Sequence, residues 1–190
     1  MRFDDFPEHL LIQLEKVLAP RIGNALVLGF PRLESDKVTL QESCQVWVLD
    51  LPQRPVAEGH LEDYRRPGEL WHHQIKVGGK PRFYARSCVE ASASGSPLLR
   101  LIEVAQSSIA EQFDGNLERL EALAGPSTED LVVRLLIVPR FDDYSFGLFA
   151  GETIRIVVPF VEEGKEAMLP SSADDAFHRI QRKPPFFGLG

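Results

Sequence analysis

The residues best suited to bind a ligand lie between positions 71 and 90, in two runs of alternating polarity on either side of Gly78 and Gly79. Two such runs around a short glycine-containing connection predict a β-hairpin. Its polar face should carry five candidate ligand-binding side chains: His72, Gln74, Arg82, Tyr84 and Arg86. Guanidinium groups with a phenol between them suit a carboxylate or phosphate through paired hydrogen bonds. The hairpin therefore predicts a site for a small anionic or aromatic ligand.

The alternative for this face is purely structural. Arg86 would pair with Glu90 or with a helix carboxylate, and Tyr84 would simply cover the sheet. Pairs of this sort are common on solvated sheet faces. Whether a helix or the loop at 52–68 encloses the face decides between the two interpretations, because ligand sites are enclosed.

The register of the hairpin decides which residues share the face. A three-residue loop at 78–80 predicts the cross-strand pairs His72 with Arg86, Gln74 with Tyr84, His73 with Ala85, Ile75 with Phe83, Lys76 with Arg82 and Val77 with Pro81. A two-residue loop would instead place Ile75 beside Arg82. We expect the three-residue loop, because a one-residue slip moves apolar side chains to the polar face.

Metal binding and several enzyme classes have no support in the sequence. His72 and His73 are adjacent, so on a regular strand they point to opposite faces and cannot hold one ion. The chain has no HExxH, GxSxG, P-loop or GxGxxG motif, so we predict no metal and no cofactor. Asp142 and Asp143 could serve acid-base chemistry, but their place between two strands predicts a turn.

The hairpin resembles that of chorismate lyase and its relatives in Trp71, Gly79, Pro81, Ala85-Arg86-Ser87 and Pro97. The resemblance covers under a sixth of the chain and implies a lyase acting on an aromatic or carboxylated substrate. In that family an arginine two positions after the Trp and a glutamate on a late strand hold the acid product. This sequence has His73 at the first place and no acidic residue within 154–160. Both departures count against that activity.

Composition favours a single folded domain over residues 1–190, because this length suits one well-buried core. The formal net charge of -7 gives no general attraction for nucleic acid or anionic lipid. No run approaches the roughly 18 apolar residues of a membrane span. We therefore expect a cytoplasmic, acidic protein with no nucleic-acid or membrane partner. Cys44 and Cys88 should be partly buried free thiols.

Local patterns predict the order of helices and strands. We expect helices over 7–19, ended by Pro20, over 96–113 with Ser96 as N-cap, continuing as a bent helix or helical hairpin to 125, and from Ser172 to Pro184. We expect strands at 25–30, 37–40, 45–51, in the hairpin, and in three runs over 131–141, 144–151 and 153–160. Residues 52–68 should form a long surface loop.

This order predicts an α+β fold with a single antiparallel sheet of about six to eight strands, meander and hairpin connections, and helices mainly on one face. The leading functional hypothesis is a non-enzymatic module that binds a protein or a small ligand. The alternative is a small-molecule enzyme of lyase or hydrolase type acting on a carboxylated or aromatic substrate.

The C-terminus carries a separate expectation. Phe186, Phe187 and Leu189 follow two prolines that prevent the preceding helix from continuing. We expect both rings to pack against the same chain. The alternative is a contact in a homodimer, because aromatic residues are favoured in interface cores.

Overall fold

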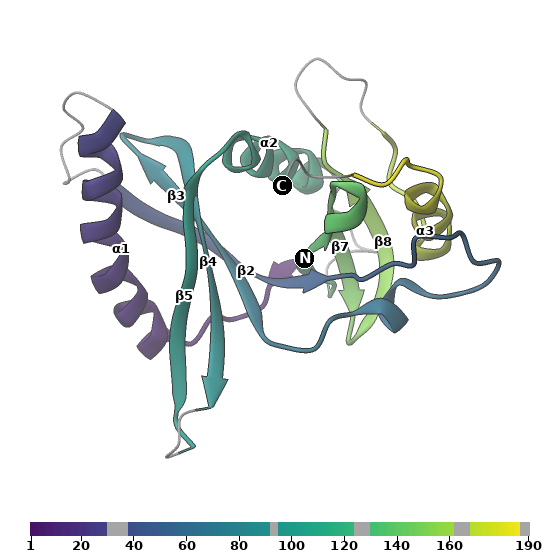
Figure 1. Cartoon of the computed structure of the whole chain (residues 1–190), viewed down its shortest axis with the longest axis horizontal. Coiled ribbons are helices and arrows are strands. Elements are labelled where there is room, and N and C mark those ends of the chain that lie inside the picture. The colour runs from purple at the N-terminus through teal and green to yellow at the C-terminus, as the bar shows by residue number, and fades with distance from the viewer. Residues whose placement is uncertain (30–37, 92–94, 124–129, 162–167, 187–190) are drawn as a thin grey trace. The chain divides into compact units, whose positions relative to one another are not determined.

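The computed structural model describes residues 1–29, 38–91, 95–123, 130–161 and 168–186. The chain has a mixed α+β fold, shown in Figure 1. Its elements are β1 (Arg2–Phe3), α1 (Glu8–Gly29), β2 (Val38–Val48), the 3-10 turn η2 (Leu61–Tyr64), β3 (Leu70–Val77), β4 (Lys80–Ala91), β5 (Pro97–Gln106), α2 (Ser108–Ala122), β6 (Val132–Val138), the 3-10 turn η4 (Pro139–Phe141), β7 (Asp143–Ala150), β8 (Thr153–Pro159) and α3 (Ala173–Gln181).

The strands form an eight-stranded sheet in the order β5-β4-β3-β2-β6-β7-β8, with β1 beside β6. Most described pairs are antiparallel, but β1 and β2 both pair with β6 in parallel. The expectation of a purely antiparallel sheet was therefore wrong. Strands joined by a short turn must run antiparallel, whereas β6 is reached from β1 and β2 through long connections that allow either direction.

Two compact units make up the chain, and β2 and α2 each contribute to both. The hairpin unit comprises Asp5–Cys44 and Gly68–Gly115. The second unit, here called the β6–β8 unit, comprises Met1–Asp4, Gln45–Pro67 and Asn116–Gly190.

In the hairpin unit, α1 covers the apolar face of the sheet. Leu14, Leu18 and Ile22 of the helix form one buried cluster with four sheet residues, Ile75, Val77, Phe83 and Ala85. The first part of α2 contacts the opposite, polar face through residues 110–114. Figure 1 shows these two helices on opposite sides of β3 and β4. Helices thus cover both faces within this unit, and the expectation of helices mainly on one face was wrong here.

Helix α1 continues past Pro20, where the sequence pattern predicted its end. Leu10, Leu14, Leu18 and Ile22 recur every four residues and are all buried, so the apolar stripe extends beyond the proline. A proline inside a helix removes one backbone hydrogen bond, and burial of this stripe offsets that loss. Residues 25–29, predicted as part of a strand, belong to the helix, and residue 30 lies outside the described residues.

Strand β5 occupies residues predicted as the start of a helix. Leu99 and Leu101 are half-buried, whereas Leu98 and Ile102 are about half exposed, which is an alternation of period two. The helix starts later, because the Ser107 hydroxyl accepts a hydrogen bond from the Ile109 backbone N–H at 3.1 Å. The predicted cap at Ser96 was therefore wrong.

The β6–β8 unit agrees more closely with the sequence patterns. The three runs within 131–160 form β6, β7 and β8, with a turn at Gly151 (φ 64°) between the last two. Helix α3 begins after Ser172, whose hydroxyl accepts a hydrogen bond from the Asp175 N–H at 3.1 Å, as predicted. Residues 38–40 and 45–48 of the runs predicted at 37–40 and 45–51 belong to one strand, β2, and residue 37 lies outside the described residues.

A cluster of buried hydrophobic side chains lies in the core of the β6–β8 unit. Its buried members are Trp47, Leu49, Leu51, Leu61, Leu136, Val138, Phe141, Phe149, Ile154, Val157, Ala176, Phe177 and Ile180. Leu61 belongs to the short turn η2, which lies within the predicted loop at 52–68.

The C-terminal expectation was wrong for one ring. The Phe186 N–H donates a hydrogen bond to the Arg140 carbonyl at 2.6 Å, but its side chain is 58% exposed. Phe187 and Leu189 lie outside the described residues.

Candidate functional site

The observed register brings four of the five predicted site residues together. His72 pairs with Arg86 and Gln74 with Tyr84, and Ile75 pairs with Phe83, as predicted. His72 and Gln74 lie on β3, and Tyr84 and Arg86 lie on β4. Because side chains alternate between the two faces of a strand, these four residues share one face of the sheet. We call these four residues the polar face.

The register changes next to the turn, where the prediction was wrong. A bulge after Ile75 pairs Lys76 with Pro81 and Val77 with Lys80, so neither predicted partner is correct. Only Gly78 and Gly79 form the loop, and both have positive φ, 61° and 78°. Two positive φ values suit the right-handed twist of a two-residue hairpin turn, and the bulge absorbs the extra residue of β4.

Helix α2 covers the polar face. The Gln74 side-chain amide donates to the Ala110 carbonyl at 2.5 Å and to the Asp114 carboxylate at 2.7 Å. The Phe113 ring stacks on the imidazole of His72 with centroids 4.8 Å apart. His72 and Gln74 are consequently fully buried and Tyr84 is only 6% exposed. The face is an enclosed polar layer between sheet and helix, not a solvated surface.

The imidazole of His72 is held by rings rather than by hydrogen bonds. It stacks on Tyr84 with centroids 5.2 Å apart as well as on Phe113. Within the described part of the chain, neither ring nitrogen has a hydrogen-bond partner. Burial, with smaller effects of Arg86 and His73, lowers the pKa of His72 to about 3, whereas the nearby Gln74 side chain opposes the shift. The ring is therefore neutral at physiological pH.

Arg86 presents an unused pair of donors. Its Nη1 lies 2.9 Å from the Glu103 carboxylate on β5, and its guanidinium carbon lies 4.9 Å from the Tyr84 ring centroid. Its Nε and Nη2 are buried, and no described group accepts a hydrogen bond from either. These two nitrogens form one edge of the planar guanidinium, which matches the two oxygens of a carboxylate.

The contacts of Gln74 determine which end of its side-chain amide is the oxygen. Both partners of Nε2 are acceptors, so the amide cannot be flipped without losing both bonds. The other end, Oε1, is buried and accepts no hydrogen bond from the described residues. Together with His72 and Arg86, it makes five buried polar atoms without partners on one face, where such groups are normally satisfied.

Arg82 does not join this group. The bulge gives it no partner in the β3–β4 register. Its side chain lines a separate cleft of about 740 Å³ with Lys80, Pro81, Gln106, Ser107, Ser108 and Glu111. None of the four residues of the polar face lines that cleft.

His73 lies on the opposite face from His72, as strand alternation predicts. Its Nδ1 is 2.8 Å from the Ser43 hydroxyl and its Nε2 is 2.8 Å from the Ser87 hydroxyl. Burial lowers its pKa to about 3 as well. Both nitrogens of His73 have hydrogen-bond partners, which indicates a structural role for the ring. Among the residues described, no group of three or more His, Cys, Asp or Glu side chains could hold a metal ion.

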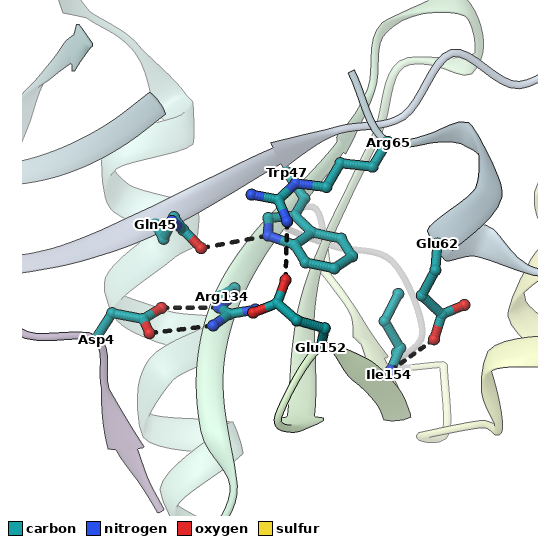
Figure 2. A network of polar contacts seen from close by, with 8 residues as sticks. All are labelled: Asp4, Gln45, Trp47, Glu62, Arg65, Arg134, Glu152 and Ile154. Atoms are coloured by element: carbon teal, nitrogen blue, oxygen red, sulfur yellow. Dashed lines mark hydrogen bonds and ion pairs between the residues drawn. The ribbon is translucent and has the colours of Figure 1, made fainter. Parts of the chain in front are cut away.

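The β6–β8 unit contains a buried arginine, Arg134, whose surroundings differ from those of the half-buried Arg86 (Figure 2). Arg134 bonds Asp4 through Nε at 2.8 Å and Nη2 at 3.3 Å, and Glu152 through Nη1 at 3.1 Å. Glu152 also accepts a hydrogen bond from Arg65 at 2.8 Å. The Arg65 guanidinium carbon lies 4.1 Å from the Trp47 ring centroid. Every nitrogen of Arg134 has a partner, which indicates a structural role.

Sequence reasoning missed three residues of the enclosed site: Glu103, Phe113 and Asp114. Glu103 was placed on a helix because β5 was not recognised, so its pairing with Arg86 was not foreseen. Phe113 and Asp114 were placed at the end of a helix with no indication of the face they cover. The alternation across Leu98–Leu101 and the Ser107–Ser108 pair before an apolar run were the available signals.

Cys44 and Cys88 are free thiols, buried and half-buried respectively, as predicted. No helix within the described ranges is both long and apolar enough to cross a membrane. No family model, no curated protein and no solved structure matches this chain. The resemblance of the hairpin to chorismate lyase therefore rests on the quoted hairpin residues alone, and the functional argument rests on the site.

Proposed function

We propose that this chain is a small-ligand-binding module that holds an organic carboxylate on the polar face, beneath α2. The observation that carries the proposal is the Nε–Nη2 edge of Arg86, which is buried and has no described acceptor. A buried guanidinium edge without acceptors is costly, and a bidentate carboxylate is the group that its geometry fits best.

The enclosure of the face favours a small ligand over a protein partner. A protein-docking surface would leave the polar residues open to solvent, whereas His72 and Gln74 are fully buried. Small-molecule sites combine apolar and aromatic walls with a few converging polar groups. Tyr84 and Phe113 stack on the imidazole of His72 here, and Arg86, His72 and Gln74 supply the polar groups.

Calorimetric titration tests the proposal with defined probes. The probes are acetate, butanoate and benzoate, each compared with its neutral amide. We expect at least one carboxylate to bind about tenfold more tightly than its amide, because only the carboxylate offers two acceptors in one plane.

Arg86→Lys is the decisive variant, because it retains the positive charge and removes the planar edge. It should weaken carboxylate binding by about tenfold or more. Arg100→Lys is the matched control, since Arg100 is an exposed arginine of β5 that pairs with Glu90 at 2.7 Å. The proposal fails if neither these carboxylates nor carboxylates that carry a further polar group bind at about 10 mM or below, or if Arg86→Lys binds them as well as the native protein.

A further inference from the structure

A count of donors and acceptors on the polar face indicates more about the ligand than its carboxylate. A neutral imidazole carries one donor and one acceptor, whichever tautomer is present. Both nitrogens of His72 are without partners among the described groups, so one of them is an acceptor that needs a donor. A carboxylate cannot supply that donor.

Gln74 presents a second acceptor with the same need. Its Nε2 is engaged by α2, which leaves Oε1 as the end that faces a ligand. His72 and Gln74 stand two residues apart on one strand face, so their side chains are neighbours. If the His72 N–H turned toward Gln74 Oε1, the other ring nitrogen would still lack a donor.

The charges around the face also constrain the ligand. Arg86 lies 2.9 Å from Glu103, and Lys76 lies 2.9 Å from Asp114. These two ion pairs cancel, and His72 is neutral. A ligand with only a carboxylate would therefore add an uncompensated negative charge to an enclosed site, which is unfavourable. A zwitterion adds none.

We infer that the ligand is an amino carboxylate, with its carboxylate on Arg86 and its amino group donating to His72 and Gln74. This inference rests on the proposed function. An ammonium group supplies three N–H donors, enough for both acceptors, whereas a hydroxyl group supplies one. The amino group also cancels the charge of the carboxylate.

Matched pairs of ligands test the inference directly. Leucine, phenylalanine and 4-aminobutanoate are each compared by calorimetry with the acid in which hydrogen replaces the amino group. At least one amino acid of the set should bind about tenfold or more tightly than its partner acid, because the partner leaves buried acceptors unsatisfied.

His72→Phe locates the preference within the protein. The phenyl ring retains an aromatic surface for Tyr84 and Phe113 but carries no nitrogen. The variant should lower the ratio of the affinities for the amino acid and its partner acid several-fold, while retaining affinity for the acid through Arg86. Gln74→Met removes the other acceptor and should lower the ratio as well. His9→Phe, an exposed histidine of α1, is the control and should preserve the ratio.

Each outcome supports or overturns a distinct claim. If no acid of either kind binds, the proposed function fails and this inference fails with it. If the acids lacking the amino group bind as tightly as the amino acids, carboxylate binding stands and the inference is overturned. If His72→Phe and Gln74→Met both preserve the native ratio, the amino group is not held where we place it.

Discussion

Acidification should destabilise this protein well above the pH at which carboxylates are protonated, because it buries two neutral imidazoles. His72 and His73 are both fully buried, and burial lowers the pKa of each from 6.5 to about 3. In the unfolded chain both rings regain an ordinary pKa. Between about pH 3 and pH 6.5 the unfolded state therefore binds more protons than the native state, so stability falls as the pH falls through that window.

The size of the effect follows from the two pKa values. At pH 5 nearly every unfolded imidazole is charged, whereas almost no native one is. Each buried ring then costs about 2 kcal/mol between pH 7 and pH 5. The free energy of unfolding should thus fall by about 4 kcal/mol for the two histidines, a large part of the stability of an ordinary domain.

Urea denaturation at pH 7 and pH 5 measures this difference. In His72→Phe the difference should shrink by about 2 kcal/mol, because one titrating ring is removed. The variant should be about as stable as the native protein at pH 7, since the removal of two unsatisfied nitrogens offsets the burial of a slightly larger ring. Equal stability of the native protein at both pH values, or an unchanged difference in His72→Phe, would refute the reasoning.

Three further predictions concern stability and use urea denaturation as the measurement. Phe83→Ala should cost on the order of 3 kcal/mol, because Phe83 is buried against α1, and an unchanged midpoint would place it outside the core. Gly147→Ala should cost about 1–3 kcal/mol, since its Cβ would lie 2.6 Å from a ring atom of Phe149. Its control, Gly115→Ala, meets no atom within 4 Å and should stabilise α2 by about 0.5–1 kcal/mol; equal effects of the two would contradict the packing argument. Arg134→Met should cost about 2 kcal/mol, because it leaves the half-buried Asp4 carboxylate without its buried partner, whereas Arg66→Met breaks only an exposed pair with Asp50 and should cost under about 1 kcal/mol. Similar costs for these two arginines would show that burial does not set the difference.

The polar face could be predicted from sequence because strand alternation is a local rule. Once the register was anchored by Ile75 and Phe83, the residues of each face followed. What lies above that face could not be predicted in the same way. The contacts of Gln74 with α2 join positions that are 36 and 40 residues apart in sequence. No local pattern reports such pairings.

The failures had local causes too. The segment from Leu98 to Val104 has apolar residues at both helical and strand spacings. A proline directly after Ser96 favours a helix, because proline is common in the first turn of helices. Pro97 instead begins an edge strand, where the missing N–H costs no ladder hydrogen bond. Pro20 predicts the end of the first helix, but α1 continues through it because the stripe of buried apolar side chains extends to Ile22.

The comparison of Arg134, which is buried, with Arg86, which is half-buried, shows why satisfaction of hydrogen bonds, rather than burial of charge, supports the candidate site. Arg134 and Arg86 each lie over an aromatic ring and each pair with a carboxylate. All three nitrogens of Arg134 donate hydrogen bonds to Asp4 or Glu152. This network is complete within the protein, which indicates that it stabilises the fold. Arg86 uses one of its nitrogens, and both nitrogens of its cross-strand neighbour His72 also lack partners among the described groups. Natural structures rarely leave buried polar atoms unmatched, and those that remain unmatched on one face indicate where a ligand contributes the missing partners.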